Sequence, residues 1–353
     1  MTVNSEPASS SAQHPAPRSR SANIRDVAKA AGVSHQTVSR VINGHPSLRE
    51  STRQRVLDAM EALQFRPNRA ARSLVTSRSG MIGVLVTNGT YFGPSSTRAA
   101  IEAAAAGAGY LVDTATLTSL DEAAFKEALG RLVDHAVEGL IILAPQEATL
   151  RQLGHLSVRL PMVTVHSTSA ADDHGLSVDQ VAGARLATRH LLELGHRNIV
   201  HIAGPDGWVE SRERIRGFRT EMAHWGLDGS RVVTGDWTSD SGFRIGQEIL
   251  GENQPTAVFS SNDQMALGLI HACRDRGLRV PDDVSVIGFD DVPDAAHFAP
   301  PLTTVRQDFT ELGRRCVAHL LTQLGVPVQN PSRTVVPELI VRRSAAVPSN
   351  STP

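Results

Sequence analysis

Apolar residues recur at helical spacing soon after residue 22. Ile24, Val27, Ala28 and Ala31 are three or four positions apart, which places them on one face of a short helix. Gly32 then interrupts the run. The pattern therefore predicts a helix that ends close to this glycine.

Two further short helices are predicted beyond it. Ser34 is suited to cap a second helix, which would bury Val38, Val41 and Ile42. A third helix is predicted over 50–63. Three helices within about forty residues, the first two joined by a tight glycine turn, are typical of a helix-turn-helix unit.

From residue 81 the pattern changes to alternating strand-like and helix-like segments. Strands are predicted at 81–87, 110–115, 139–143, 162–166, 198–203, 231–235, 257–261 and 284–289, and helices for example at 179–194 and 263–276. This α/β alternation predicts parallel sheets covered by helices. About 265 residues exceed what one six-stranded sheet needs, so we expect two lobes, with ligands binding beyond the carboxyl ends of the strands.

Composition narrows the class of protein. Apolar residues make up 41% of the 353 residues, enough for a sizeable core, and the two cysteines exclude a disulfide framework or a cysteine-rich zinc site. No apolar run reaches about 18 residues, and the Ser-, Ala- and Pro-rich start lacks the apolar segment of a signal peptide. These features predict a cytoplasmic protein without membrane contact.

The net charge of −1 conceals an asymmetry along the chain. Residues 1–79 contain 12 Lys and Arg against 5 Asp and Glu, whereas the remainder contains 23 basic and 31 acidic residues. A basic head on an acidic body predicts a polyanion-binding module. The alternative is a solubilising tail.

The exposed face of the second predicted helix carries side chains that can read DNA. Arginine can bind guanine and glutamine can bind adenine through two hydrogen bonds, while hydroxyls at helix starts suit phosphates. The candidates are Ser34, His35, Gln36, Thr37, Ser39, Arg40, Asn43 and Thr52. The alternative is an ordinary solvated helix face.

Several strings of residues resemble the lac-repressor/galactose-repressor family of bacterial transcriptional regulators. They lie at 26–28, 31–34, 36–41 and 67–72 in the head, and at 204–205, 235–237, 262–268, 288–291, 300–304 and 307–309 beyond it. The resemblance continues to about residue 343. It implies a helix-turn-helix head, a hinge helix and a two-lobed core like a periplasmic sugar-binding protein.

The resemblance assigns roles in the head and hinge. Gln36 and Arg40 would read bases, and His35 replaces a tyrosine of the pattern. Hinge contacts fall on Asn68, Arg69, Ala71 and Leu74, the last as an apolar wedge in the minor groove, where it would unstack one base step. A plain linker residue is the alternative for Leu74.

These patterns and the resemblance together divide the chain. We expect a disordered tail at 1–22, the helix-turn-helix domain at 23–66, and a hinge helix with linker at 67–79. The effector-binding and dimerisation core spans 80–345, with lobe one at about 80–178 and 308–336 and lobe two at about 179–307 and 337–345. A second disordered tail is expected at 346–353.

A sugar offers many hydroxyls and one apolar face, so its site needs planar polar groups and an aromatic platform. Polar candidates are Arg214, Asn262, Gln264, Asp290 and Gln307, and the aromatic ones are Trp237 and Phe309. The resemblance places these in an effector site and adds Thr87, Tyr91, Pro94 and His166. His166 replaces an aspartate of the pattern and Glu210 a serine. Taken singly, each could instead be a loop cap or a core residue.

Signatures of enzymes are missing from the chain. It has no Gly-x-Ser-x-Gly elbow, no His-Glu-x-x-His and no Walker A motif, and its histidines show no metal-ligand spacing. We therefore expect no enzyme activity, no cofactor and no metal.

The sequence thus predicts a transcriptional repressor that binds double-stranded operator DNA as a homodimer. A sugar effector, a galactoside or a similar mono- or disaccharide, would bind between the lobes, separate the hinges and release the DNA. Alternatives are a soluble sugar-binding transport component, a sugar-modifying enzyme, an activator, or a regulator with a purine or amino-acid effector.

Overall fold

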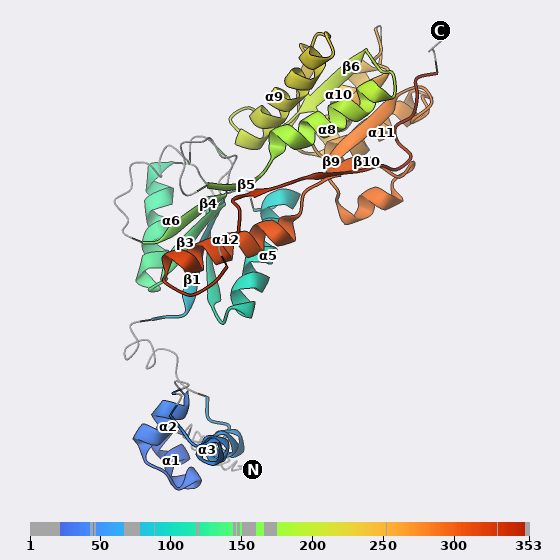
Figure 1. The fold of residues 1–353 in the computed structure, drawn as a ribbon. Coiled ribbons are helices and arrows are strands. Elements are labelled where there is room, and N and C mark those ends of the chain that lie inside the picture. The colour runs from blue at the N-terminus through green and yellow to red at the C-terminus, as the bar shows by residue number, and fades with distance from the viewer. Residues whose placement is uncertain are drawn as a thin grey trace, which may run out of the picture. The chain divides into compact units, whose positions relative to one another are not determined.

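The computed structural model describes residues 22–42, 45, 47–66, 78–87, 89–117, 119, 121–143, 146, 149, 160–165, 175–251, 253–329 and 331–349 (Figure 1). The chain divides into two compact units, 1–79 and 80–353. The predicted hinge contacts at 68–74 lie outside the described residues.

In its described residues, the N-terminal unit has three helices around a small aliphatic core. These are α1 (Ile24–Ala31), α2 (His35–Ile42) and α3 (Glu50–Ala62). Buried residues from all three meet in one cluster made of Val27, Ala28, Ala31, Val38, Val41, Val56 and Ala59. The predicted helix-turn-helix arrangement is confirmed.

Local hydrogen bonds set the boundaries of the first two helices. Asn23 accepts from the backbone N–H of Asp26, and the Asp26 carboxylate accepts from the Asn23 N–H, which forms a capping box. Gly32 ends α1 in the left-handed conformation with φ 64°. Ser34 Oγ accepts from the Thr37 N–H at 3.1 Å, as expected of a cap.

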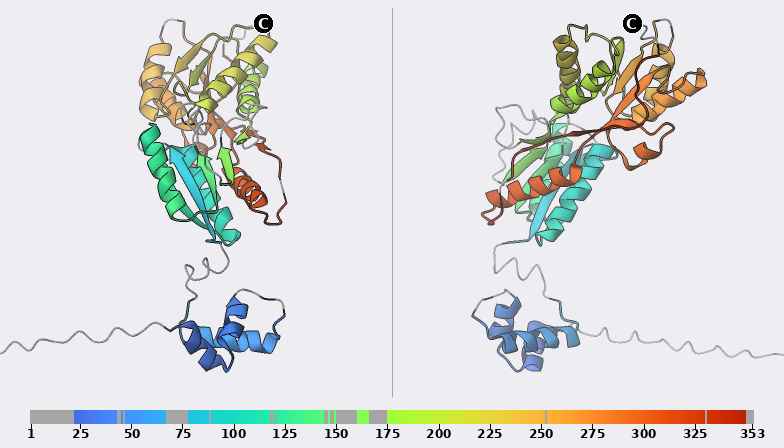
Figure 2. Two further views of the ribbon diagram at one scale, coloured as in Figure 1. Left: turned by 90° about the vertical axis from the view of Figure 1, so that its left-hand side faces the viewer. Right: turned by 45° about the vertical axis from the view of Figure 1, so that its right-hand side comes forward.

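The first sheet of the second unit is parallel, in the order β11-β5-β4-β3-β1-β2. Its strands are β1 (Met81–Thr87), β2 (Leu111–Leu117), β3 (Gly139–Leu143), β4 (Met162–Val165), β5 (Gly175–Val178) and β11 (Thr334–Val335). Alternate residues of β1 face opposite sides. Ile82 packs with α5 (Phe92–Gly107) and α12 (Phe309–Gln323), whereas Leu85 packs with α6 (Glu122–Asp134) on the other face (Figure 2).

The second sheet has the order β12-β10-β9-β8-β6-β7, and β12 is its one antiparallel strand. The strands are β6 (Ile199–Ala203), β7 (Val232–Thr234), β8 (Ala257–Ser260), β9 (Ser285–Asp290), β10 (Thr303–Arg306) and β12 (Glu338–Ile340). One face is covered by α8 (Gln180–Glu193) and α9 (Val209–His224), the other by α10 (Ser239–Ile249) and α11 (Asp263–Asp275). A short 3₁₀ helix, η1 (Pro293–His297), follows β9.

The chain passes between the two lobes where β5 leads into α8, β10 into α12 and β11 into β12. Gln180 begins α8 at the first crossing and Gln307 lies in the second. These crossings therefore place polar side chains where the two lobes meet.

Two sequence expectations need correction. The short strands β5, β10, β11 and β12 were not predicted, because pairing with neighbouring strands, not an apolar pattern of their own, makes them strands. The expectation of disorder from residue 346 is wrong for 346–349. The Ala346 N–H donates to Ser285 Oγ at 3.0 Å, and the Ala346 carbonyl lies 2.8 Å from His196 Nε2.

Within the described part of the chain, no helix has both the length and the apolar character needed to cross a membrane.

Candidate effector pocket and DNA-reading helix

Helix α2 presents a polar face opposite its buried residues. His35, Gln36 and Arg40 are exposed, whereas Val38 and Val41 are buried against the rest of the unit. Ser39 and Thr37 are half-buried at the edge of this face. The helix therefore has solvent-facing donors and acceptors in the arrangement that reading a major groove requires.

The predicted phosphate-binding hydroxyls are partly engaged within the unit. Ser34 Oγ lies 3.0 Å from Thr37 Oγ1 in addition to capping α2. Thr52 is half-buried in the first turn of α3, and Asn43 lies outside the described residues.

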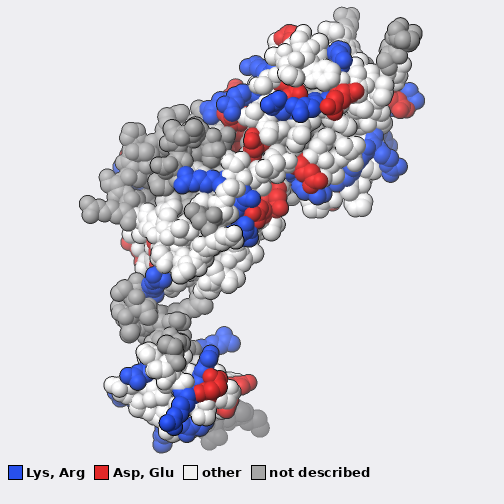
Figure 3. Space-filling view, in the orientation of Figure 1, with Lys and Arg blue, Asp and Glu red and all other residues white. Residues whose placement is uncertain are grey.

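Basic side chains outnumber acidic ones on the described part of this unit (Figure 3). The basic residues are Arg25, Lys29, Arg40, Arg49, Arg53, Arg55, Arg66 and Arg78, against Asp26, Glu50, Asp58 and Glu61. This excess suits a polyanionic partner.

The second unit contains a cavity with about 740 Å³ of empty space, counting its open mouth. Its lining comprises Tyr91, Phe92, Gly93, Pro94, Thr97, Leu143, Val165, Ser177, Val178, Gln180, Trp208, Glu210, Arg214, Trp237, Asn262, Asp290, Gln307, Phe309 and Leu312.

Both lobes and the crossings between them contribute to this cavity. The start of α5 supplies Tyr91 to Thr97, and the start of α9 supplies Trp208, Glu210 and Arg214. Trp237, Asn262 and Asp290 come from the carboxyl ends of strands β7, β8 and β9 or just after them. Ligands of parallel α/β sheets bind at such ends.

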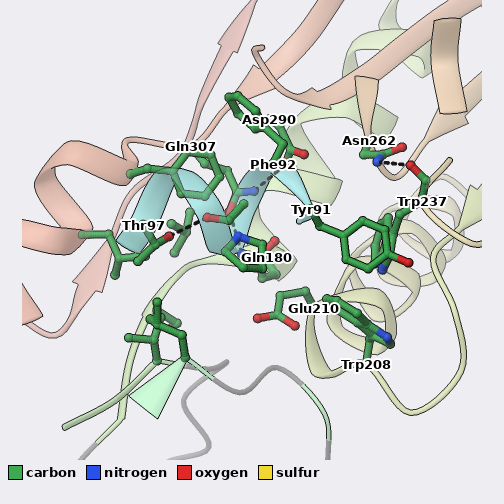
Figure 4. Close-up of a pocket in the computed structure, with 18 of the residues that line it drawn as sticks. Tyr91, Phe92, Thr97, Gln180, Trp208, Glu210, Trp237, Asn262, Asp290 and Gln307 are labelled. Atoms are coloured by element: carbon green, nitrogen blue, oxygen red, sulfur yellow. Dashed lines mark hydrogen bonds between the residues drawn. The ribbon is translucent and has the colours of Figure 1, made fainter. Parts of the chain in front are cut away.

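Four buried side chains form a closed polar ring in the cavity wall. Arg214 Nε donates to Gln180 Oε1 at 2.8 Å, and Gln180 Nε2 donates to Gln307 Oε1 at 2.8 Å. Gln307 Nε2 donates to Asp290 Oδ1 at 2.6 Å, and this oxygen lies 3.8 Å from Arg214 Nη2 (Figure 4). None of the four is more than 7% exposed. The ring thus satisfies polar groups that would otherwise be costly to bury.

Burial shifts the pKa values of the two ionisable groups in the ring, Asp290 and Arg214. Burial raises the pKa of Asp290 to about 6, although Arg214 and the hydrogen bond from Gln307 act in the opposite direction. Burial also lowers the pKa of the Arg214 guanidinium, which Asp290 partly offsets. Arg214 is further held by the Ser261 carbonyl and by the Phe289 ring, 4.0 Å from its guanidinium carbon.

Trp237 is positioned by close packing and by its own backbone. It has φ 72°, and a Cβ added at Gly204 would lie 2.1 Å from its ring, so glycine is needed there. Asn262 Nδ2 donates to the Trp237 carbonyl at 2.9 Å, while Asn262 Oδ1 caps α11 through the Met265 N–H. Trp237 Nε1 is buried, and no described residue accepts a hydrogen bond from it. It is therefore a donor available to a ligand.

Backbone strain is concentrated beside Asp290. Asp290 and Asp291 have φ 107° and 55°, a region that non-glycine residues adopt at a cost of about 1–3 kcal/mol each. Arg306 and Arg342 each donate to the Asp291 carboxylate at 2.7 Å. These ion pairs hold the turn that directs Asp290 into the ring.

Most predicted effector residues line the cavity. They are Tyr91, Pro94, Arg214, Trp237, Asn262, Asp290, Gln307 and Phe309. Thr87 and Gln264 do not: the Thr87 hydroxyl donates to Gln146 Oε1 at 2.5 Å, and Gln264 Oε1 accepts from Asn262 Nδ2 at 3.1 Å. His166 lies outside the described residues.

Sequence reasoning missed Phe92, Gln180 and Trp208 as cavity residues. Gln180 lies just beyond strand β5, separated from it by Asp179. Because β5 was not predicted, the sequence did not indicate that Gln180 lies at the end of a strand. Trp208 lies in the loop just before α9. A tryptophan at such a loop position is the sequence signal that could have identified it.

Two family models match the chain. Residues 23–68 match bacterial regulatory proteins of the lacI family, and residues 188–345 match a periplasmic binding protein-like domain.

Full-length relatives agree with these matches. The lactose operon repressor of Escherichia coli K12 is 35% identical over 93% of this chain and 91% of its own length. The repressor PurR of Haemophilus influenzae Rd is 36% identical over 92% of this chain and 98% of its own.

Solved structures show the same fold. The lac repressor dimer bound to operator and the anti-inducer ONPF superposes with a TM-score of 0.80 at 33% identity, covering 93% of this chain and all of that one. The regulator CelR in complex with cellobiose has a TM-score of 0.66 at 30% identity, covering 92% of this chain and all of that one. The chain belongs to the lacI family of bacterial regulatory proteins, as a transcriptional repressor rather than an enzyme.

Proposed function

We propose that this repressor binds operator DNA in the cytoplasm as a homodimer and is released by a sugar bound in the cavity. The observation that carries the effector part is the polar ring next to aromatic walls. Its amide, carboxylate and guanidinium groups suit hydroxyls, while Trp237 and Phe309 suit the apolar face of a saccharide.

The relatives support the dimer, the operator DNA and the kind of ligand in this proposal. The lac repressor structure is a dimer bound to operator, and CelR is in complex with the disaccharide cellobiose. Arg40 and Gln36 on α2 supply the base-reading groups. Two heads are needed because a dimer reads two half-sites, whereas one small head contacts few bases.

Coupling between effector and DNA would arise from the composition of the cavity wall. Tyr91 and Phe92 belong to one lobe, Trp208 and Arg214 to the other, and Gln307 to a crossing. A ligand that touches all of them stabilises one arrangement of the lobes over another. Such coupling amounts to about 1–3 kcal/mol in typical allosteric proteins. In this proposal, the change reaches the DNA through residues 67–79.

A purine is the second candidate effector. The planar rings of Tyr91, Phe92 and Trp208 in the lining favour it, because flat heterocycles stack on aromatic side chains.

A gel-shift assay on DNA from the region upstream of the gene tests these proposals. We expect a specific complex that mono- or disaccharides dissociate and that purines leave intact. Dissociation or tightening by a purine, with no response to any sugar, would replace the sugar by the second candidate. Transcription from a promoter that overlaps the operator then distinguishes repression from activation.

A further inference from the structure

We infer that the effector carries one positive charge, held by Glu210 beside the rings of Tyr91, Trp208 and Trp237. The chemical class is a hydroxylated amine, such as an amino sugar in its ammonium form. This inference rests on the proposed function of the cavity and specifies the chemistry of its ligand.

The first observation is the environment of Glu210. It is the second residue of α9 and lines the cavity, and its buried Oε2 has no hydrogen-bond partner among the described residues. Figure 4 shows its side chain directed into the cavity, with Gln180 on one side and Trp208 on the other. A buried carboxyl oxygen without a partner is costly, so it marks where a donor from a ligand would bind.

The second observation is the balance of charge among the described lining residues. They include two carboxyl groups, Glu210 and Asp290, and one guanidinium, Arg214. Arg214 is already engaged by Gln180, the Ser261 carbonyl and Asp290. An ionised Glu210 would therefore lack a counter-ion among these residues. Burial accordingly raises the pKa of Glu210 to about 7, despite its own backbone N–H and Arg214.

The third observation is the arrangement of aromatic rings at this end of the cavity. Tyr91 and Trp208 meet at 5.5 Å with an interplanar angle of 81°, and Trp208 and Trp237 meet at 5.6 Å with 69°. Rings nearly perpendicular to one another form adjoining walls, and aromatic faces attract cations. The Arg214 guanidinium, 5.5 Å from the Trp237 ring, already uses this property.

A cation at this position would also contact both lobes. Tyr91 immediately precedes α5 of the first lobe, whereas Trp208 immediately precedes α9 of the second lobe and Glu210 lies in its first turn. The ligand's charge would thus draw the two lobes together, which a neutral hydroxyl hydrogen-bonded to a protonated Glu210 would do less strongly.

Isothermal titration calorimetry with matched sugar pairs tests the inference. The full-length protein at pH 7 is titrated with D-galactosamine and D-galactose, D-glucosamine and D-glucose, and D-mannosamine and D-mannose. We expect at least one amine to bind ten times or more tightly than its neutral partner. If no amine binds, or if every neutral sugar binds as tightly as its amine, the inference is wrong.

Variants locate the effect at Glu210. Glu210→Gln keeps the size of the side chain and removes its charge. It should lower the affinity of the amine to that of its neutral partner. Glu193→Gln removes an exposed carboxylate from α8 and should change neither affinity. Equal losses for both members of a pair in Glu210→Gln would overturn the inference, provided that a thermal melt shows a folded protein.

Gel shifts with the same sugars separate this inference from the proposed function. If neutral sugars release the DNA and amines do not, the proposal of a sugar-responsive repressor is supported and the inference of a charged effector is wrong. If neither kind of sugar changes DNA binding while a purine does, the sugar effector itself is wrong.

Discussion

Asp290 and Arg214 hold the polar ring together from two elements of the same lobe. Asp290 ends β9 and Arg214 lies in the second turn of α9, and each is buried with the other as its nearest opposite charge. Removing either leaves the other without full compensation, which is costly inside a protein. Neither residue belongs to the N-terminal unit that carries α2.

We therefore expect Asp290→Ala and Arg214→Ala to bind operator and to ignore the effector. The lost hydrogen bonds weaken effector affinity, while the base-reading side chains of α2 are unchanged. A gel shift with increasing effector measures this directly, with wild-type protein as the control. A normal release curve in both variants would remove these residues from the effector site.

His201 contacts Ser261, which in turn binds Arg214 of the polar ring. The burial of His201 should make the free energy of unfolding depend on pH. It is fully buried between Phe218 and Phe259, and its Nε2 lies 3.3 Å from the hydroxyl of Ser261, whose carbonyl binds Arg214. Burial lowers the pKa of His201 to about 3, so the folded state keeps it neutral.

The sign follows from the lower pKa in the folded state. The unfolded chain takes up a proton below about pH 6.5, so the stabilisation is complete above that pH and is lost as the pH falls toward 3. Denaturant unfolding of wild type and His201→Phe should differ by about 1.4 kcal/mol per pH unit between pH 6 and 4. The comparison cancels the opposite contributions of Glu210 and Asp290. Parallel stability curves for the two proteins would contradict this assignment.

At the scale of elements, helix α2 combines a buried apolar face with an exposed polar one. Val38 and Val41 fasten it to the three-helix core, so its exposed side chains occupy defined positions. Those positions follow from helical periodicity alone, and the sequence predicted them correctly. The short strands β5 and β10 are the contrast, since their neighbours in the sheet, not their own pattern, make them strands.

The exposed Arg40 on α2 leads to a prediction about specificity. Arg40→Ala should cost about 1–3 kcal/mol of binding free energy on the operator and little on random DNA, because base contacts carry the specificity. Fluorescence anisotropy with both DNAs at one salt concentration measures the two losses. Equal losses on both would make Arg40 a phosphate contact instead.

At the scale of the whole molecule, residues 346–349 belong to the packed second lobe, through contacts of Ala346 with Ser285 and His196. Assembly concerns the DNA-reading heads. One small head contacts few bases, whereas two heads read two half-sites.

We expect sedimentation at micromolar concentration to give a mass near twice the 37.8 kDa of one chain. Two half-sites on the operator require two heads. A mass near four times that of the chain would refute the dimer, and a mass near that of one chain would refute the assembly model itself.

The sequence by itself determined the features that depend on neighbours a few positions apart. Helical spacing, Gly32 and the Ser34 cap specify the three-helix head, and buried apolar runs such as 81–87 and 139–143 specify strands with their observed bounds. Family motifs placed Arg214, Asn262 and Asp290 at the cavity. The helical spacing, the caps and the apolar runs can be read from the sequence because the interactions that they reflect join residues a few positions apart.

Only the tertiary structure decided which of those side chains meet. Gln180 and Gln307 are 127 positions apart and are joined because two crossings between the lobes bring them together. In the part of the chain that the structure describes, one Glu210 oxygen has no partner because Arg214, one turn away on the same helix, is directed toward Gln180 and Asp290 instead. Long-range packing sets these partners, and a pattern of nearby residues contains no information about them.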